Sequence, residues 1–184
     1  MRGIGIIGRA RTGKDTIGER LVSKHGFARV AFADPLKAAV LKANPLYSLD
    51  GKYGRARIAD LVDEIGWERA KSSPEVRRTL QAFGQSIRDI DSGFWIRAAM
   101  RQARSVGKSG RRPVVITDVR YRNEATALHA AGFVLVHVDR PGVTRLSHES
   151  EGALGPQDAQ VAIVNDGTVA ELHAKTDDIA SRMP

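Results

Sequence analysis

Residues 8–16 read GRARTGKDT, and they follow a short apolar run at residues 4–7. An amphipathic segment, residues 17–25, comes directly after them. A strand, a glycine-rich turn and a helix in this order are the context that a phosphate-binding loop requires. The two glycines allow backbone conformations that are closed to residues with a Cβ. Successive N–H groups can then point at phosphate oxygens, and the helix N-terminus adds a positive dipole.

The spacing of this loop is G-x-x-x-x-G-K, with Lys14 as the mobile cation for the β- and γ-phosphates. The next residue is Asp15, where the usual pattern has Ser or Thr, and the hydroxyl is displaced to Thr16. A carboxylate beside phosphates is repelled unless it binds Mg²⁺ or its water shell. We therefore predict that Asp15 and Thr16 serve Mg²⁺ through water, and the sequence leaves open which of them dominates.

The composition is that of an ordinary globular protein of one domain. The chain has 184 residues, 42% hydrophobic and 27% charged, which is enough for a sizeable core. No apolar run approaches the roughly 18 residues of a membrane span, and no signal peptide is visible. With no cysteine there is neither a disulfide framework nor a thiolate metal site. We expect a cytoplasmic protein without a membrane partner.

The charge is strongly basic but uneven along the chain. The formal net charge is +8, and residues 149–184 hold only two basic but seven acidic side chains. The first 148 residues therefore hold 27 basic and 14 acidic groups. Such a basic majority indicates polyanionic partners, either nucleic acid or nucleotides with several phosphates. Because the basic residues are scattered, they favour a lined cleft over a nucleic-acid-binding tail.

Strands alternate with helices along the chain, which predicts an α/β fold with a mostly parallel five-stranded sheet and helices on both faces. The expected strands are residues 2–8, 27–32, 114–116, 133–138 and 161–164. The expected helices are 14–25, a helix capped by Asp34, one near 58–65, and then 74–90, one from Ser92, 122–131 and 168–181. A loop at 44–54, a basic turn at 107–113 and a polar lid at about 140–157 complete the prediction.

The predicted helix at 74–90 has two distinct faces. At about 100° per residue, Val76, Leu80, Phe83 and Ile87 share one stripe. The opposite stripe holds Arg78, Gln81, Gln85 and Arg88. These polar side chains are either simply solvated, or they face a cleft that binds a phosphate and a base.

Several further motifs accompany the loop, and together they span most of the chain. They are the GKDT of residues 13–16, FADPLK at 32–37, LQ-x-x-G-x-x-x-R at 80–88 with Trp95 behind it, ITDVRY-x-NE at 116–124, and NDGT at 165–168. In their order and spacing they resemble the phage deoxynucleoside monophosphate kinases. The resemblance implies a P-loop NTPase fold with a core at 1–33 and 108–184, a helical monophosphate-binding insertion at about 34–107, and a short lid.

The same resemblance implies an ATP-dependent phosphotransferase that converts a deoxynucleoside monophosphate into its diphosphate for DNA precursor synthesis, with Mg²⁺ as cofactor. The ATP-binding residues would be Gly8, Ala10, Arg11, Thr12, Gly13, Lys14, Asp15 and Thr16. The acceptor would be bound by Asp34, Lys37, Arg78, Gln81, Gly84, Arg88, Trp95, Asp118, Arg120 and Glu124. The catalytic group would be Lys14, Arg88, Asp118 and Arg140, with Arg145 reaching in from the lid.

Each of these roles has a plainer alternative. Asp118 could be a helix cap, a Mg²⁺ ligand through water, or an acceptor-site residue, and the resemblance favours the last. Trp95 could be core packing, and Arg140 and Arg145 could be solvated. His148 receives no role.

Two other functions compete with the first. One is another small P-loop kinase, such as one that acts on dephospho-coenzyme A. The other is a non-catalytic basic module for nucleotides or DNA, which would need a clustered basic patch that the sequence does not have. We therefore expect ATP and a deoxynucleoside monophosphate as partners and no stable binding to nucleic acid. A homodimer is left open.

Overall fold

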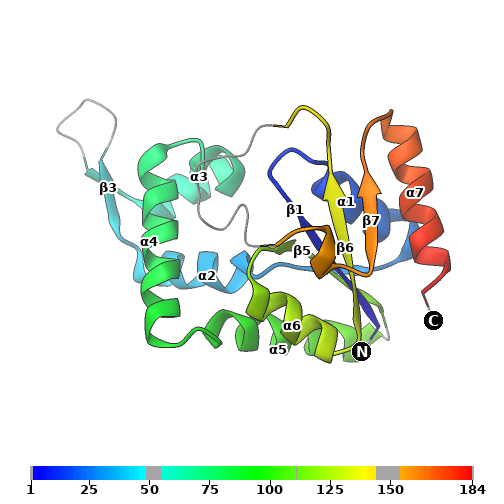
Figure 1. The fold of residues 1–184 in the computed structure, drawn as a ribbon. Helices are drawn as coiled ribbons and strands as arrows, with labels where there is room; N and C mark the ends of the chain where they lie inside the picture. Colours follow the sequence, from blue (N-terminus) through cyan, green and yellow to red (C-terminus); the bar gives the residue numbers. More distant parts are fainter. Residues whose placement is uncertain (1, 49–54, 111, 144–153, 184) are drawn as a thin grey trace. The chain divides into compact units, whose positions relative to one another are not determined.

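The computed structural model describes residues 2–48, 55–110, 112–143 and 154–183. Contacts between Cα atoms divide the chain into two compact units, which we describe one at a time. The first unit contains Met1–Phe32 and Ala98–Pro184, and the second contains Ala33–Arg97. The arrangement of elements is drawn in Figure 1.

The first unit is built on a five-stranded parallel sheet (Figure 1). Its strands are β1 (Gly3–Gly8), β2 (Ala28–Val30), β5 (Val114–Val119), β6 (Phe133–Asp139) and β7 (Val161–Val164). Their order across the sheet is β2-β5-β1-β6-β7, and every pair is parallel. β1 therefore lies in the centre, with β5 and β6 on either side of it. The predicted α/β class with five strands is confirmed.

Both faces of β1 are covered, because its residues alternate between two apolar layers. Ile4 and Ile6 belong to a buried cluster with Ile17 and Leu21 of helix α1 (Lys14–His25) and Leu172 of helix α7 (Val169–Ser181). On the other face Gly5 lies against Leu128 of helix α6 (Arg122–Ala130) and Leu135 of β6. The sheet thus has helices on both faces, as the sequence predicts.

The ends of α1 follow from local sequence signals. The helix begins at Lys14, directly after the loop, and ends at His25 before Gly26 with φ 69°. Gly26 takes the left-handed conformation that usually closes a helix. Gly18 lets α1 approach β5 closely, since a Cβ there would lie 2.7 Å from Cγ2 of Thr117.

The pairing of β1 with β5 changes register near the carboxyl ends of the two strands. Gly5 pairs with Ile116 but Ile7 pairs with Val119, so β5 has one more residue than β1 across this step. A bulge of this kind redirects the side chains around it and is common beside active sites. Asp118 lies within it.

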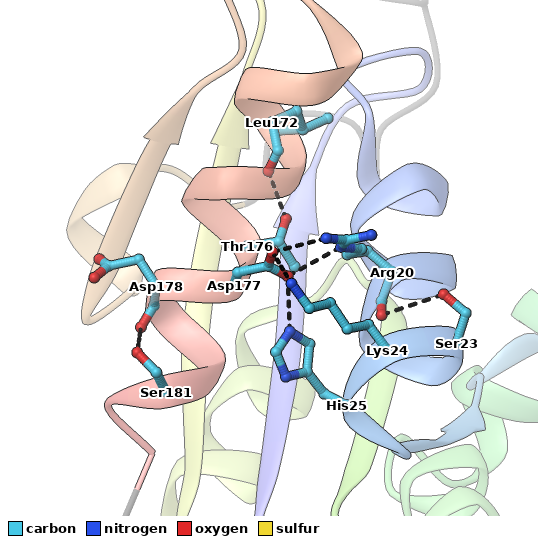
Figure 2. Close-up of polar contacts among 9 residues, drawn as sticks. All are labelled: Arg20, Ser23, Lys24, His25, Leu172, Thr176, Asp177, Asp178 and Ser181. Carbon is cyan, nitrogen blue, oxygen red and sulfur yellow. Dashed lines mark hydrogen bonds and ion pairs between the residues drawn. The ribbon is translucent and has the colours of Figure 1, made fainter.

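A four-residue ion-pair cluster joins α1 to α7 (Figure 2). Both carboxylate oxygens of Asp177 accept from the guanidinium of Arg20, at 3.0 and 2.8 Å. Lys24 Nζ lies 2.8 Å from Oδ2 and His25 Nε2 lies 2.7 Å from Oδ1. These contacts hold the pKa of Asp177 well below its usual range, and the hydrogen bonds from Arg20 contribute most.

We expect Asp177→Asn to lower the thermal unfolding midpoint by a few degrees at pH 7. A depressed carboxyl pKa in the folded state stabilises the protein above the unfolded pKa of about 4. That stabilisation is lost as the pH falls below about 4, toward the folded value. The gap between wild type and variant should therefore shrink on acidification. Asp178→Asn, on the neighbouring position of α7, is the control, and a gap independent of pH would contradict the assignment.

The second unit is mainly helical. It contains α2 (Ala33–Ala43), α3 (Ile58–Ala70), α4 (Pro74–Ile90) and the first residues of α5 (Phe94–Gly110), with an antiparallel strand pair, β3 (Leu46–Ser48) and β4 (Arg55–Arg57). Its core includes Val40, Tyr47, Ile58, Val76 and Leu80. α4 has the predicted bounds, and its apolar stripe packs into this core through Val76, Leu80 and Phe83.

Four local predictions were wrong. The predicted loop at 44–54 contains β3, and the second strand is only Ala28–Val30. Asp34 lies inside the first turn of α2 rather than capping it, because the helix begins at Ala33. α5 continues to Gly110 and so includes the first four residues of the predicted basic turn at 107–113.

Each helix in the described part of the chain is too short or too polar to span a bilayer.

Candidate functional site

The loop of residues 8–13 joins the carboxyl end of β1 to the first residue of α1. Gly8 and Gly13 have φ 153° and 102°, and Arg11 has φ 65°. Three positive φ angles within six residues bend the backbone sharply, as a phosphate-binding concavity requires. Thr12 is 0% exposed and its Oγ1 donates to the carbonyl of Arg9 at 2.9 Å, which closes the loop upon itself.

Lys14 and its neighbours lie at the N-terminus of α1. The ammonium of Lys14 donates to the carbonyl of Arg9, so the side chain folds back over its own loop. Asp15 is exposed and Thr16 is partly exposed in the first helical turn. Within the described part of the chain, no group of three or more His, Asp or Glu side chains could hold a metal ion without a ligand's help. Mg²⁺ commonly uses only one or two protein groups together with phosphates and water, and Asp15 with Thr16 fits that chemistry.

A shallow hollow, open to solvent, lies beside the loop. It is lined by Ile7, Gly8, Arg9, Val119, Arg120, His137 and Leu154. These residues come chiefly from the carboxyl ends of β1, β5 and β6, where the chain crosses from one side of β1 to the other. Open parallel sheets bind ligands at such a place. Arg9 and Arg120 make the rim of the hollow cationic, which suits a phosphorylated ligand.

His137 is a residue of this hollow that sequence reasoning missed. It is 9% exposed, and burial is the main cause that lowers its pKa, with the nearby charge of Arg9 acting in the same direction. The carboxylates of Asp139 and Asp158 oppose that shift. The available signal was a polar residue near the carboxyl end of an otherwise apolar strand.

Asp118 has a structural partner at the end of β2. Its Oδ1 accepts the backbone N–H of Phe32 at 2.8 Å, so the carboxylate ties β5 to the chain two residues beyond the end of β2. The side chain stays partly exposed. It therefore holds the backbone with one oxygen while lying at the same sheet edge as the loop.

Glu124 lies behind the turn that carries Arg120. It is 1% exposed, and its Oε2 accepts the backbone N–H groups of Arg120 at 2.9 Å and Tyr121 at 3.1 Å. Arg120 itself is exposed at the hollow. These contacts support a role for Glu124 in shaping the turn, and its direct contact with an acceptor stays a prediction.

Replacing Glu124 with alanine should lower the free energy of unfolding by about 1.5–3 kcal/mol, because two N–H groups lose a charged acceptor. Glu124→Gln keeps an oxygen of the same shape and should lose less. Denaturant unfolding measures both. A fully stable Glu124→Ala combined with an altered acceptor KM would instead support the direct contact.

The acceptor residues predicted from α4 lie in the second unit. Of these, Arg78 and Gln81 are exposed and Arg88 is partly exposed. Gln85, which shares the polar face, is also exposed. Gln85 Nε2 donates to Asp89 Oδ1 at 2.7 Å, one turn along the helix. The polar face is thus exposed along most of its length.

Asp34 and Lys37 occupy the first turns of α2, both partly exposed. Lys37 Nζ lies 5.8 Å from the ring centroid of Trp67, which is within cation–π range. The arrangement keeps this ammonium on the helix surface.

Trp95 is a core residue of the second unit. It is 2% exposed, and its indole N–H donates to the carbonyl of Gly84 at 3.1 Å. Gly84 in turn lies against Leu36, 3.1 Å from where its own Cβ would be. The observations support packing, the plainer of the two interpretations, for Trp95.

Of the two arginines predicted to reach in from the lid, Arg140 lies among the described residues. It is exposed directly after β6, and its carbonyl accepts the N–H of Val143 at 3.3 Å. Arg145 and His148 lie outside the described residues, as does most of the predicted lid.

Comparison with known proteins agrees with this geometry. Residues 50–176 match the deoxynucleotide monophosphate kinase family. A protein of Acanthamoeba polyphaga mimivirus is assigned by its name to the deoxynucleotide monophosphate kinases. It is 30% identical to this chain over an alignment of 190 positions, which covers 94% of this chain and 92% of that protein. The deoxynucleotide monophosphate kinase of Enterobacteria phage T4 is 29% identical over 65% of this chain, which spans 48% of that enzyme.

The fold is also found among solved structures. Dephospho-CoA kinase from Campylobacter jejuni superposes with a TM-score of 0.50 at 15% identity, covering 97% of this chain and 95% of that one. At this identity the likeness shows the fold alone.

A parallel sheet with a G-x-x-x-x-G-K loop between its central strand and a helix defines a P-loop nucleotide-binding protein. Within that class the match over residues 50–176 is decisive. The chain belongs to the deoxynucleotide monophosphate kinase family.

Proposed function

We propose that this chain transfers the γ-phosphoryl group of ATP to a deoxynucleoside monophosphate. The observation that carries the proposal is the loop of residues 8–13, which ends at Lys14 beside the cationic hollow with Arg9 and Arg120. In the transfer, an oxygen of the acceptor phosphate bonds to the γ-phosphorus while the bond to the β–γ bridging oxygen breaks, which releases ADP. No strong base is needed, because the acceptor phosphate is already dianionic near neutral pH.

Positioning and charge neutralisation supply most of the catalysis in such a reaction. Lys14 is assigned to the β- and γ-phosphates, since it can exchange the Arg9 carbonyl for a phosphate oxygen. Arg78 and Arg88 are assigned to the acceptor phosphate, and Gln81 to the acceptor nucleoside. Arg140, directly after β6, is assigned to the transferred group.

Asp15 and Thr16 would hold Mg²⁺, which when bound to the phosphates neutralises part of their charge. Asp15 is well suited because it is exposed in the first turn of α1, beside the loop.

The substitution Asp118→Asn distinguishes the two possible roles of Asp118, binding Mg²⁺ and binding the acceptor. Asp118→Asn keeps an oxygen for the N–H of Phe32 but removes the charge, so the fold should be retained. We expect the acceptor KM to rise about ten-fold, the typical effect of losing one charge-assisted contact, with an unchanged Mg²⁺ requirement. A Mg²⁺ titration at saturating ATP measures the Mg²⁺ requirement, and an acceptor titration at saturating ATP and Mg²⁺ measures the KM. A raised Mg²⁺ requirement with an unchanged acceptor KM would assign Asp118 to the metal.

The proposal as a whole is tested by ADP release from ATP with a panel of acceptors. The panel contains the four common deoxynucleoside monophosphates, the matching ribonucleotides and dephospho-coenzyme A. We expect turnover with at least one deoxynucleotide and none with dephospho-coenzyme A, and Lys14→Ala gives the blank. Turnover with dephospho-coenzyme A alone would replace this proposal with the competing kinase activity.

A further inference from the structure

We infer that Asn165 is a positioning residue for the ATP-binding loop, acting through the peptide group between Thr12 and Gly13. Asn165 follows β7 and is 7% exposed. Its Nδ2 donates to the carbonyl of Thr12 at 2.9 Å, a buried contact. The inference rests on the proposed binding of ATP by this loop and adds a residue outside the loop to the ATP site.

The direction of one loop N–H follows from this contact. A trans peptide group is planar, so its C=O and N–H point in opposite directions. Since Asn165 holds the C=O of Thr12 on one side, the N–H of Gly13 must point to the other. In a loop that binds phosphate through successive N–H groups, an inverted peptide would present a carbonyl oxygen to the anion instead. The contact therefore selects the orientation that binds phosphate.

The fit between Gly13 and Asn165 is too close for any side chain at position 13. A Cβ on Gly13 would lie 2.6 Å from Nδ2 of Asn165 and 3.0 Å from Cδ2 of Leu172. The φ of 102° at Gly13 is also one that L residues rarely adopt. The second glycine of the loop is thus required both by its backbone and by the amide packed against it.

Asn165 can impose this orientation because its own position is fixed from two sides. Its backbone N–H donates to the carbonyl of Asp139 at the end of β6, at 2.7 Å. Beyond it, Thr168 caps α7, with Glu171 Oε2 accepting the N–H of Thr168 at 2.6 Å. Lys175 Nζ donates to the carbonyl of Val164 at 2.7 Å. The turn after β7 is therefore a rigid support for the loop.

The loss of this support should appear in nucleotide binding rather than in acceptor binding. In Asn165→Asp the shape is kept, but the side chain cannot donate and sets an oxygen against the carbonyl of Thr12. In Asn165→Ser the hydroxyl is too short to reach that carbonyl. We expect either variant to bind a non-hydrolysable ATP analogue about ten-fold more weakly, which is the scale of one lost phosphate contact.

The experiment is a calorimetric titration with the ATP analogue, carried out on wild type, both Asn165 variants and the control Asp166→Asn. Thermal unfolding and the acceptor KM are measured for the same four proteins. Asp166 is the next residue of the same turn and is exposed. We expect a weaker Kd for the analogue, an unchanged acceptor KM and a wild-type Kd in the control. If Asn165→Asp does not fold, the milder Asn165→Ser decides.

A folded Asn165 variant with the wild-type Kd for the analogue would overturn the inference, whatever its melting temperature. That result leaves the proposed function intact. Conversely, a wild type that binds the analogue but phosphorylates no deoxynucleotide contradicts the proposed function and leaves the role of Asn165 standing.

Discussion

Lys14→Ala should reduce kcat at least about 100-fold, the usual scale for removing one group that stabilises charge in the transition state. The ammonium already contacts the carbonyl of Arg9 within the loop, so it is positioned before ATP arrives. Without it, the negative charge that develops on the phosphates loses its mobile counter-charge. Steady-state kinetics with saturating ATP and acceptor measure the loss.

Two controls separate chemistry from folding. The thermal unfolding midpoint of Lys14→Ala should stay within about 2 °C of wild type, because the side chain is partly exposed. Lys42→Ala, which removes an exposed lysine from α2, should leave kcat unchanged. A folded Lys14→Ala with near wild-type turnover would refute the assignment of this loop.

Arg88→Ala should raise the acceptor KM or lower kcat by roughly ten- to a hundred-fold, since charge-assisted contacts are worth about 1.5–3 kcal/mol. Arg88 shares the polar face of α4 with Arg78 and Gln81, opposite the face that packs through Val76 and Leu80. The Kd for a non-hydrolysable ATP analogue should not change, because the residue is assigned to the acceptor.

The control for Arg88→Ala is Arg101→Ala, which removes an exposed arginine from α5. This variant should keep the acceptor KM of wild type. That result would show that a general loss of positive charge does not explain the effect of Arg88→Ala. If Arg88→Ala weakened the binding of ATP and of the acceptor equally, the polar face of α4 would not bind the acceptor alone.

The parts of the fold that the sequence predicts best are those with strong local signals. The bounds of α1 and α4 match the predicted ones, because Gly26 closes the first and Pro74 opens the second. β7 also has its predicted bounds. The strand pair β3–β4 was missed, since short strands rich in polar residues have no periodicity to reveal them.

Individual site residues were harder to predict, because residue type does not determine burial. Trp95 and Glu124 have side chains that suit a ligand, yet both are buried with their polar atoms engaged by the backbone. His137 belongs to no motif, and the NDGT motif that begins at Asn165 does not itself indicate a contact with the loop of residues 8–13. Their roles depend on strand order, which places the ends of β1, β5, β6 and β7 along one edge of the sheet.

The hydrogen bond from Asn165 to Thr12 joins residues that are 153 positions apart. During synthesis on a ribosome at about 5–20 residues per second, residue 165 is made roughly 8–30 s after residue 12. β1 also waits for β5 and β6, its two neighbours in the sheet. The nascent chain therefore carries its nucleotide-binding loop for most of translation without the partner that orients it. The loop therefore reaches its full affinity for ATP only after nearly all of these residues have been translated, which makes it one of the last parts of the protein to mature.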